Sequence, residues 1–364
     1  MASPKLRFKE FDGDWNKTTL GKVVVFSNGK RIPLSENDRQ KRQGSYRYYG
    51  ASGVIDYIDD YIFDGQYILI GEDGANILTR SSALAFTVVG KFWVNNHAHI
   101  FQSKDGDNFF LATYLESLNY ERFNSGTAQP KLNLENLKKV PVANPSKEEQ
   151  TKIASFLSAV DEKINLLTQK YELLSQYKQG MMQKLFSQQI RFKADDGSEF
   201  GEWENLKFRD VITIKYGKDH KALKEGNIPV LGTGGIMRYV DSYLYDGDSI
   251  LIGRKGTIDK PQFISGKFWT VDTLFYTEIG ERLIPKFVYQ QLLLVNWLNL
   301  NEATGVPSLN TTSIGNIEVK VPCLEEQTQI ANFLSAIDQK IETVAQQIEQ
   351  AKQWKKGLLQ QMFV

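Results

Sequence analysis

Two stretches far apart in this chain nearly copy each other. Residues 148–164 read EEQTKIASFLSAVDEKI and residues 325–341 read EEQTQIANFLSAIDQKI, with thirteen of the seventeen positions identical. The repeat continues outside these stretches, because residues 50–74 match residues 232–256, and GKFW occurs at 90–93 and again at 266–269. Each copy is about 180 residues long, whereas solenoid repeats have periods of roughly 20–50 residues. The sequence therefore predicts a duplicated domain pair.

The first part of each copy indicates a compact, mostly β domain. It is rich in Gly, Tyr, Phe and Asn and contains short alternating runs such as YIFDGQYILIG at 61–71. Such alternation is typical of strands, and Asp-Gly at 64–65 and at 246–247 is a turn or hairpin signal. The spacing of apolar residues in 108–120 and 285–299 adds some helix to each domain.

The second part of each copy predicts a long helix. Ser146 is placed to N-cap the first helix, and Glu149 is placed to close a capping box. Lys178 and Lys355 interrupt the apolar pattern at the same place in the two copies. Apart from them, apolar residues recur at alternating steps of four and three over about five heptads, which is the seam of a coiled coil. We assign to this seam Ile153, Leu157, Val160, Ile164, Leu167 and Leu174 in the first helix, and Ile330, Leu334, Ile337, Ile341, Val344 and Ile348 in the second.

The short connections predict how the two helices run. The second β-rich domain follows the first helix almost directly and leads straight into the second helix, so those two helix ends must be close. Seams that pack on each other must therefore run antiparallel; the alternative is a seam that joins separate chains. We predict an α+β fold of two similar, mostly-β domains joined by two long antiparallel coiled-coil helices with pseudo-two-fold symmetry. The expected segments are 1–145, 146–188, 189–322 and 323–364.

Composition and motifs give little sign of chemistry. The net charge is +1, the single cysteine is Cys323, and no apolar run is long enough to span a membrane or to mark a signal peptide. We therefore expect a cytoplasmic protein. GTGG at 232–235 lacks the lysine of a phosphate-binding loop. His97 and His99 are two of only three histidines, so we expect no metal site and assign His97 a base-contact or structural role. The chain is not expected to be an enzyme by itself.

The layout of the chain is similar to a known family. The LRF…F.G.W openings and the P…EEQ.KIA.FLS..D.KI helices resemble those of the specificity subunit of type I restriction–modification systems, over essentially the whole chain. A small departure is the missing counterpart of Pro229 in the first domain. The resemblance implies two target-recognition domains, each reading one half of a bipartite, asymmetric DNA site. It implies helices that set the gap between the halves and dock two adenine-N6 methyltransferase subunits, and restriction subunits that complete the complex. It also implies no cofactor in this chain, with S-adenosylmethionine, ATP and Mg in the partner subunits.

The physical reading of the residues agrees with a DNA target. Two heads held at a fixed distance suit a ligand that repeats at a fixed spacing, as double-helical DNA does. The loops of the two heads differ where the framework is alike, most clearly in GEDGAN (71–76) against GRKGTI (253–258). Two alternatives remain: a two-headed protein-interaction scaffold without a DNA role, and a self-contained enzyme.

The candidate DNA contacts are polar loop residues of the types that pair with base edges. About a third of them should touch DNA; Arg80 could equally be a structural cation, and Glu72 and Asp73 could accept from a cytosine amine or hold a turn. In the first head the candidates are Lys30, Arg31, Tyr46, Arg47, Ser52, Asn76, Arg80, Asn95, Asn96, His97, Asn124, Ser125, Thr127, Gln129 and Lys131. In the second head they are Lys218, His220, Lys221, Thr233, Arg254, Lys255, Thr257, Thr304, Ser308 and Asn310.

Overall fold

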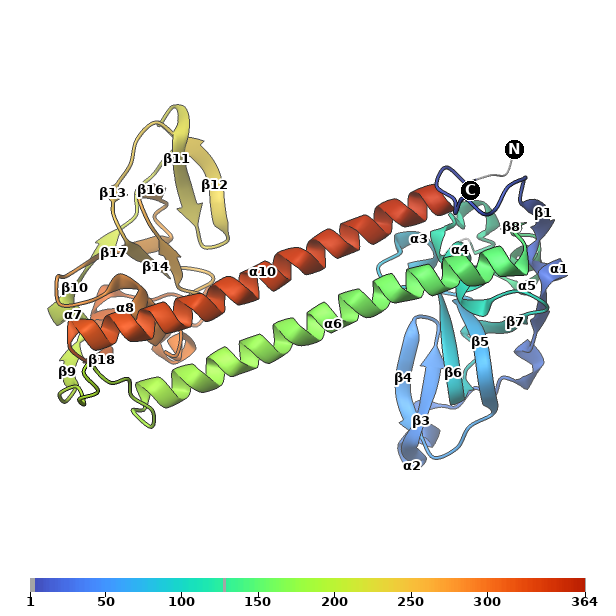
Figure 1. Cartoon of the computed structure of the whole chain (residues 1–364), viewed down its shortest axis with the longest axis horizontal. Helices are drawn as coiled ribbons and strands as arrows, with labels where there is room; N and C mark the ends of the chain where they lie inside the picture. Colours follow the sequence, from blue (N-terminus) through green and yellow to red (C-terminus); the bar gives the residue numbers. More distant parts are fainter. Residues whose placement is uncertain (1–3, 127–128, 364) are drawn as a thin grey trace. The chain divides into compact units, whose positions relative to one another are not determined.

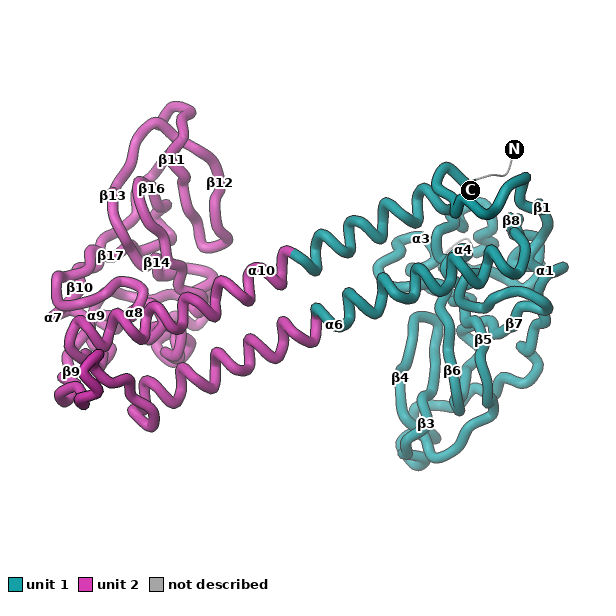
Figure 2. Tube along the Cα trace, viewed as in Figure 1, with its two compact units in different colours: residues 1–167, 347–364 teal, residues 168–346 magenta. Residues whose placement is uncertain are grey.

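The computed structural model describes residues 4–126 and 129–363 and divides the chain into two compact units (Figures 1 and 2). Unit 1 contains residues 1–167 and 347–364, and unit 2 contains residues 168–346. The two long helices, α6 (Lys147–Phe186) and α10 (Leu324–Met362), each contribute one part to either unit. The units therefore do not coincide with the four segments expected from the sequence, whose boundaries stay a prediction.

The first head is built on a six-stranded sheet. Its strand order is β2 (Val24–Phe26), β7 (Ala98–Ser103), β5 (Phe63–Gly71), β6 (Ala85–Val94), β3 (Gln43–Gly50) and β4 (Gly53–Ile58), and only β3 and β6 pair in parallel. A separate antiparallel pair joins β1 (Asn16–Thr19) to β8 (Pro141–Asn144). The helical elements are α1 (Leu20–Val23), η1 (Asn28–Lys30), α2 (Glu36–Lys41), α3 (Asn76–Thr79), α4 (Asn108–Ser117), η2 (Glu121–Phe123) and α5 (Leu134–Lys138).

The second head repeats this strand order, but its counterparts of β5 and β6 are each divided into two shorter strands. One four-stranded sheet has the order β10 (Ile212–Tyr216), β17 (Leu274–Ile279), β14 (Ser249–Gly253) and β15 (Gln262–Ile264). The other has the order β12 (Gly235–Val240), β11 (Glu225–Gly232), β16 (Lys267–Thr270) and β13 (Tyr245–Asp246), with β11 and β16 parallel. The remaining elements are β9 (Glu204–Lys207) paired with β18 (Glu318–Val321), α7 (Phe208–Val211), α8 (Pro285–Leu292), η3 (Trp297–Leu300) and α9 (Thr311–Gly315).

Glycines at equivalent places mark where the strands are continuous in the first head and divided in the second. In the first head Gly65 of β5 pairs with Gly90 of β6, and both adopt positive φ without interrupting their strands. In the second head Gly247 and Gly266 occupy the same places and separate β13 from β14 and β15 from β16. The hairpin signal at Asp64-Gly65 was therefore wrong: glycine bends the strand there without reversing it.

The cores of both heads include residues of the two long helices. In unit 1, Ile153, Leu157 and Val160 of α6 join the head's core together with Leu358 and Met362 of α10. In unit 2 the same pattern recurs: Ile330, Leu334 and Ile337 of α10 join the core with Met182 and Leu185 of α6. The other seam residues differ in burial, since Leu167, Val344 and Ile348 are buried whereas Ile164, Leu174 and Ile341 are partly buried.

The two lysines that interrupt the seam each pair with an aspartate of the other helix. In unit 2, Lys178 Nζ of α6 lies 2.6 Å from Asp338 Oδ1 of α10. In unit 1, Lys355 Nζ of α10 lies 2.5 Å from Asp161 Oδ1 of α6. Each unit thus combines the start of one helix with the end of the other, so the helices run antiparallel, as predicted.

A buried carboxylate fastens each head to the start of a helix. Glu149 Oε1 accepts from Arg7 Nε at 2.7 Å and from Trp15 Nε1 at 3.1 Å, and Oε2 accepts from Arg7 Nη2 at 2.7 Å. Ser146 Oγ accepts from the Glu149 amide at 3.3 Å, so the predicted N-cap is present. The prediction that Glu149 closes a capping box was wrong, because its carboxylate is bound by Arg7 and Trp15 instead.

The second copy reproduces this arrangement with the equivalent Arg, Trp and Glu residues of the repeat. Glu326 accepts from Arg191 Nε at 3.1 Å, from Arg191 Nη2 at 2.8 Å and from Trp203 Nε1 at 3.0 Å, and its side chain is fully buried. The repeated LRF, Trp and EEQ motifs therefore form one structural device, present twice. In the lower-dielectric surroundings of buried groups, charge-assisted hydrogen bonds of this kind are among the strong ones.

The chain enters its two heads in equivalent ways. Ile190 N donates to Lys184 O at 3.3 Å, where the chain passes from α6 into the second head. In unit 1 the equivalent hydrogen bond joins opposite ends of the chain, since Leu6 N donates to Gln361 O at 2.9 Å. The N-terminal segment therefore continues from the end of α10 as the second head continues from α6, but without a covalent link.

Candidate nucleic-acid interface

Three loops of the first head are tied together by backbone hydrogen bonds. Glu72 N donates to His97 O at 2.8 Å, and Leu132 N donates to Glu72 O at 2.7 Å. Gly74 N donates to Pro130 O at 3.0 Å. We call the described residues of 72–80, 95–97 and 124–132 loop cluster 1; it lies next to the ends of β5, β6 and β7. A rigid sheet thus holds the region that contains most of the first head's candidates.

The second head ties its loops in the same way. Arg254 N donates to Thr273 O at 2.8 Å, and Leu309 N donates to Arg254 O at 2.9 Å. Gly256 N donates to Pro307 O at 2.9 Å. We call residues 254–257, 271–273 and 304–310 loop cluster 2. The matching hydrogen bonds show that Arg254 occupies the position that Glu72 has in the first head.

Glu72 of loop cluster 1 is neutralised by Arg31, from the loop after β2, and by Lys131. Arg31 Nη1 lies 2.9 Å from Glu72 Oε2 and also donates to the carbonyls of Asn96 at 3.3 Å and Ala98 at 2.7 Å. Lys131 Nζ lies 3.7 Å from Glu72 Oε1. Arg31 and Glu72 are each mostly buried, so this ion pair belongs to the head's own structure.

The two histidines of HAH have different roles. His97 is exposed, and its Nδ1 lies 2.9 Å from Asp73 Oδ2. His99 is buried: its Nε2 lies 2.7 Å from Leu132 O, and its Nδ1 lies 2.8 Å from Asn28 Nδ2. The Asn28 amide is oriented by Ile100 N, which donates to Asn28 Oδ1 at 3.0 Å. His99 therefore fits a neutral ring with the hydrogen on Nε2, and burial lowers its pKa below the usual 6.5.

Several candidates in the first head are engaged in holding turns. Asn76 Oδ1 accepts from Ser82 N, Asn95 Oδ1 accepts from His97 N, and Asn124 Oδ1 accepts from the amides of Gly126 and Lys131. Arg80 has a left-handed backbone and pairs with Glu116 at 2.8 Å. Tyr46 packs against Tyr61. The exposed candidates are Lys30, Arg47, Ser52, Asn96, His97, Ser125, Gln129 and Lys131. Thr127 lies outside the described residues.

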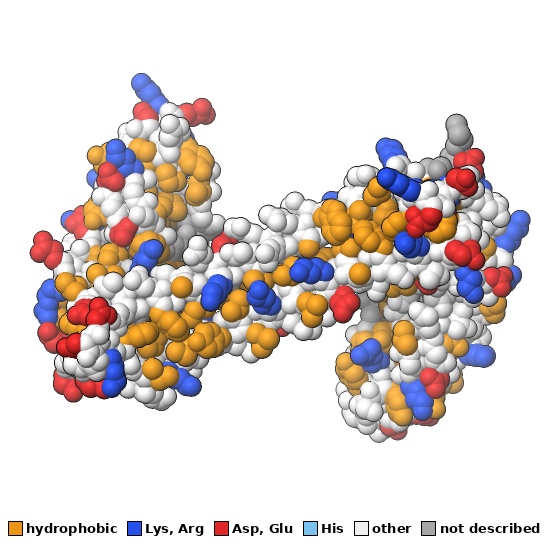
Figure 3. Space-filling model, viewed as in Figure 1, with side chains coloured by type: hydrophobic (Ala, Val, Ile, Leu, Met, Phe, Trp, Pro, Cys, Tyr) orange, Lys and Arg blue, Asp and Glu red, His pale blue; other side chains and the backbone are white. Residues whose placement is uncertain are grey.

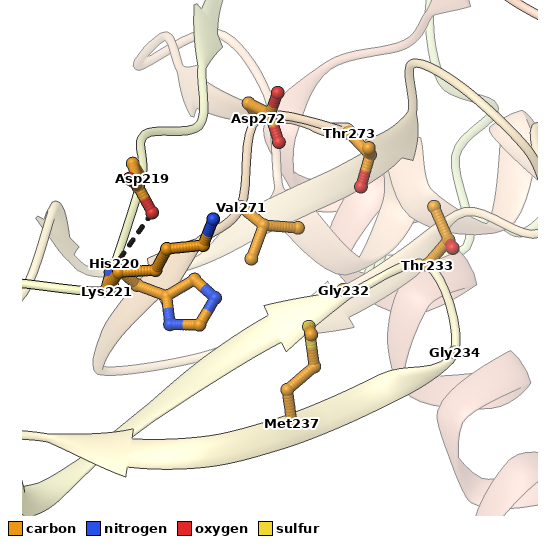
Figure 4. A pocket seen from close by; sticks show the side chains of 10 residues that line it. All are labelled: Asp219, His220, Lys221, Gly232, Thr233, Gly234, Met237, Val271, Asp272 and Thr273. Carbon is orange, nitrogen blue, oxygen red and sulfur yellow. Dashed lines mark hydrogen bonds between the residues drawn. The ribbon is translucent and has the colours of Figure 1, made fainter.

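The second head has an open hollow beside loop cluster 2. Its volume is about 650 Å³, and the side chains of His220, Val271 and Met237 face one another across it (Figure 4). Lys221 N donates to Asp219 Oδ1 at 3.1 Å and thereby shapes the loop at one side. The other lining residues are Gly232, Thr233, Gly234, Asp272 and Thr273. The hollow thus brings together candidates from two distant loops, His220 with Lys221 and Thr233.

The remaining candidates of the second head are distributed around this hollow and loop cluster 2. Lys218, Lys255, Thr257 and Thr304 are exposed, and Ser308 is partly buried. Asn310 caps α9 through Oδ1, which accepts from Ser313 N at 2.7 Å. Sequence reasoning did not select Tyr216, Asp272 or Thr273, because their proximity to Arg254 arises only from the pairing of strands β10, β14 and β17.

Neither unit has a surface with charges of only one sign. On the face shown in Figure 3, basic and acidic side chains are interspersed over each unit, in line with the net charge of +1. Among the described residues no group of three or more His, Cys, Asp or Glu side chains is placed to hold a metal ion. Within the same residues no helix is long and apolar enough to cross a membrane.

These observations define a two-headed recognition protein, in which one framework occurs twice and carries two chemically different loop clusters. The family described as type I restriction modification DNA specificity domain matches residues 12–176 and 201–353. The chain therefore belongs to the family of type I restriction–modification specificity subunits. Members of this family contain DNA recognition domains and are non-catalytic parts of their complexes.

Individual relatives agree with this assignment. The chain is 27% identical, over 88% of its length and 86% of the relative's, to a putative type I restriction enzyme specificity subunit of Haemophilus influenzae. It is 25% identical to the type I restriction enzyme MjaVIII specificity subunit of Methanocaldococcus jannaschii, with 97% and 94% of the two chains covered. Its fold is similar to the crystal structure of the type I restriction-modification system S subunit from M. genitalium, with a TM-score of 0.73, 19% identity and coverage of 100% and 99%.

Proposed function

We propose that each head reads one half of a bipartite, asymmetric DNA site through its own loop cluster. The observation that carries this proposal is the contrast between equivalent positions: Glu72 in a neutralised cluster in the first head and Arg254 in a basic one in the second. The hydrogen-bonded loop framework is the same in both heads, so its side chains alone would distinguish the two half-sites.

We further propose that α6 and α10 set the gap between the half-sites and dock two adenine-N6 methyltransferase subunits. The near-identical helix starts at 148–164 and 325–341 support two equivalent docking sites for two copies of one partner. Restriction subunits would complete the complex. The partner subunits, and not this chain, would bind S-adenosylmethionine, ATP and Mg.

Binding of the complex with its methyltransferase to DNA tests the first proposal. We expect strong preference for one bipartite sequence, and affinity that falls steeply with salt because phosphate contacts release counterions. Equal affinity for all sequences, or no association with the methyltransferase, would refute it. A protein-interaction scaffold would instead show ligand binding with little salt dependence.

Changing the helices tests the second proposal. One heptad inserted at equivalent places in α6 and α10 lengthens each helix by about 10 Å, or roughly 3 base pairs. Genome-wide mapping of methylated adenines should then show the same two half-sites with a longer gap. Exchange of the first head, residues 1–146, should change one half-site and leave the other and the gap intact. A variant that keeps the original gap would contradict the role of the helices.

A further inference from the structure

In each head an arginine guanidinium group donates a hydrogen bond to the equivalent backbone carbonyl, although the two arginines come from different loops. In the first head Arg31 Nη1, from the loop after β2, donates to Asn96 O at 3.3 Å. In the second head Arg254 Nη1, from the residue that follows β14, donates to Asp272 O at 3.0 Å. Asn96 and Asp272 are equivalent, because the residue after each accepts the matching hydrogen bond from Glu72 N or Arg254 N.

The two guanidinium groups differ in their partners. Arg31 is neutralised by Glu72 at 2.9 Å and donates to a second carbonyl, that of Ala98. In the second head Arg254 stands at the position of Glu72, so the carboxylate that neutralises Arg31 has no counterpart there. Within residues 4–126 and 129–363 Arg254 forms no ion pair. Lys221 lines the same hollow as Asp272 and Thr273. The second head therefore presents an uncompensated cation where the first presents a closed ion pair.

Arg254 is also held in a fixed orientation. Its guanidinium lies over the ring of Tyr216, with Cζ 5.5 Å from the ring centroid, and Nη1 is bound to Asp272 O. Stacking on an aromatic face restricts a flexible side chain and lowers the entropy lost on binding. The described residues provide no hydrogen-bond acceptor for Nε or Nη2, so these donors are available to a ligand.

We propose that Arg254 is the residue with which the second head reads a guanine, an assignment that rests on the proposed DNA-reading function. Two donors in a planar fork match the O6 and N7 acceptors of guanine in the major groove, whereas adenine presents a donor beside N7. Asp272 and Thr273 connect the Arg254 loop to the wall of the hollow of about 650 Å³. A guanine bound to Arg254 would thus lie next to this hollow, which leaves room for neighbouring nucleotides. Arg31, closed by Glu72, has no such role in the first head.

The test uses the complete chain in complex with its methyltransferase. The second half-site is first identified by exchanging residues 189–322 and mapping the methylated motif. Duplexes carrying 7-deazaguanine at each guanine of that half-site in turn then remove one N7 acceptor at a time. The variants are Arg254→Gln and, as a matched control for the loss of one positive charge, Lys260→Gln, whose side chain is exposed in the same head.

For one guanine, we expect 7-deaza substitution to weaken wild-type binding by about tenfold, the size of a good base contact. The same substitution should leave binding by Arg254→Gln unchanged, because the contact is already lost, while Lys260→Gln should respond as the wild type does. Arg254→Gln should also tolerate other bases at that position.

Three results would overturn the assignment. The second half-site contains no guanine; every 7-deaza effect persists in Arg254→Gln; or Arg254→Gln weakens specific and non-specific DNA equally, which would mark a phosphate contact. A wild-type complex without sequence preference would refute the proposed function itself, whereas a specific wild-type complex with any of the three results refutes only the role of Arg254.

Discussion

The buried carboxylate that fastens the second head to α10 should be a major source of stability in unit 2. Glu326 is fully buried and accepts three hydrogen bonds, two from Arg191 and one from Trp203. Glu326→Ala leaves the mostly buried guanidinium with only the Gly201 carbonyl, at 2.7 Å, and leaves the Trp203 N–H unpaired. Breaking a buried ion pair from one side costs about 3–5 kcal/mol. Because domains are stable by only about 5–15 kcal/mol, unit 2 should become marginally stable.

The assay combines urea unfolding with hydrogen exchange. We expect Glu326→Ala to lower the urea midpoint and to remove protection in residues 191–203 and in the first turns of α10. Residues 7–15 should keep their protection, because the Glu149 arrangement is intact in unit 1; Glu149→Ala should give the converse pattern. Glu199→Ala is the control, since the Lys193–Glu199 pair is largely exposed and should contribute at most about 1 kcal/mol.

A further variant separates the ion pair from the packing around it. Arg191→Met combined with Glu326→Leu removes both charges and keeps apolar volume, so it should recover much of the stability lost in Glu326→Ala. The Trp203 N–H stays unpaired in this variant and should keep a cost of about 1–3 kcal/mol. The reasoning is refuted if Glu326→Ala costs no more than Glu199→Ala, or if protection is lost equally in the two units.

Three more perturbations follow from the structure. Burial lowers the pKa of His99 below 6.5, so on acidification the unfolded chain takes up this proton before the folded chain does. The contribution of His99 to stability should therefore be complete above about pH 6.5 and decrease as the pH falls below it. A urea midpoint that falls as steeply with decreasing pH in His99→Gln as in the wild type would contradict this. The single variants Lys178→Asp and Asp338→Lys should each lose roughly 1 kcal/mol of unfolding free energy, and the double variant, which swaps the two charges, should recover most of that loss. If thermal unfolding shows that the two losses simply add in the double variant, the pairing is contradicted. A circular permutant would join the two chain ends by a short flexible linker and open the chain in the exposed turn after α6. It should keep its helix content and melting temperature, because Leu6 N already donates a hydrogen bond to Gln361 O. Loss of cooperative melting would refute the structural continuity between the N-terminal segment and the end of α10.

The sequence predicted the elements whose signals are local. The heptad spacing predicted α6 and α10, and the short connections predicted that they run antiparallel. Ser146 caps α6 as expected, because a cap depends on residues three positions apart. The Asp-Gly signal failed at 64–65, because the same dipeptide suits a turn or a glycine bend within a strand, and the pairing with Gly90 decides between them.

The candidate residues show the same division. Polar loop composition located the regions around both loop clusters, but it did not distinguish Asn95, which holds a turn, from the exposed Asn96. Whether such residues contact DNA stays a prediction. The distinction depends on backbone amides and carbonyls of neighbouring loops, which leave no periodic signal in the sequence.

By itself the sequence determined that this protein has two copies of one framework, two long helices with a shared apolar pattern, and heads that differ in their loops. Only the tertiary structure decided that Glu149 and Glu326 are the buried anchors of the heads, and that Arg31 is neutralised while Arg254 is not. The physical reason is the range of the interactions: helix periodicity and capping act over a few residues, whereas these pairs join residues far apart in the chain. Their charge and burial are set by how strands and loops dock.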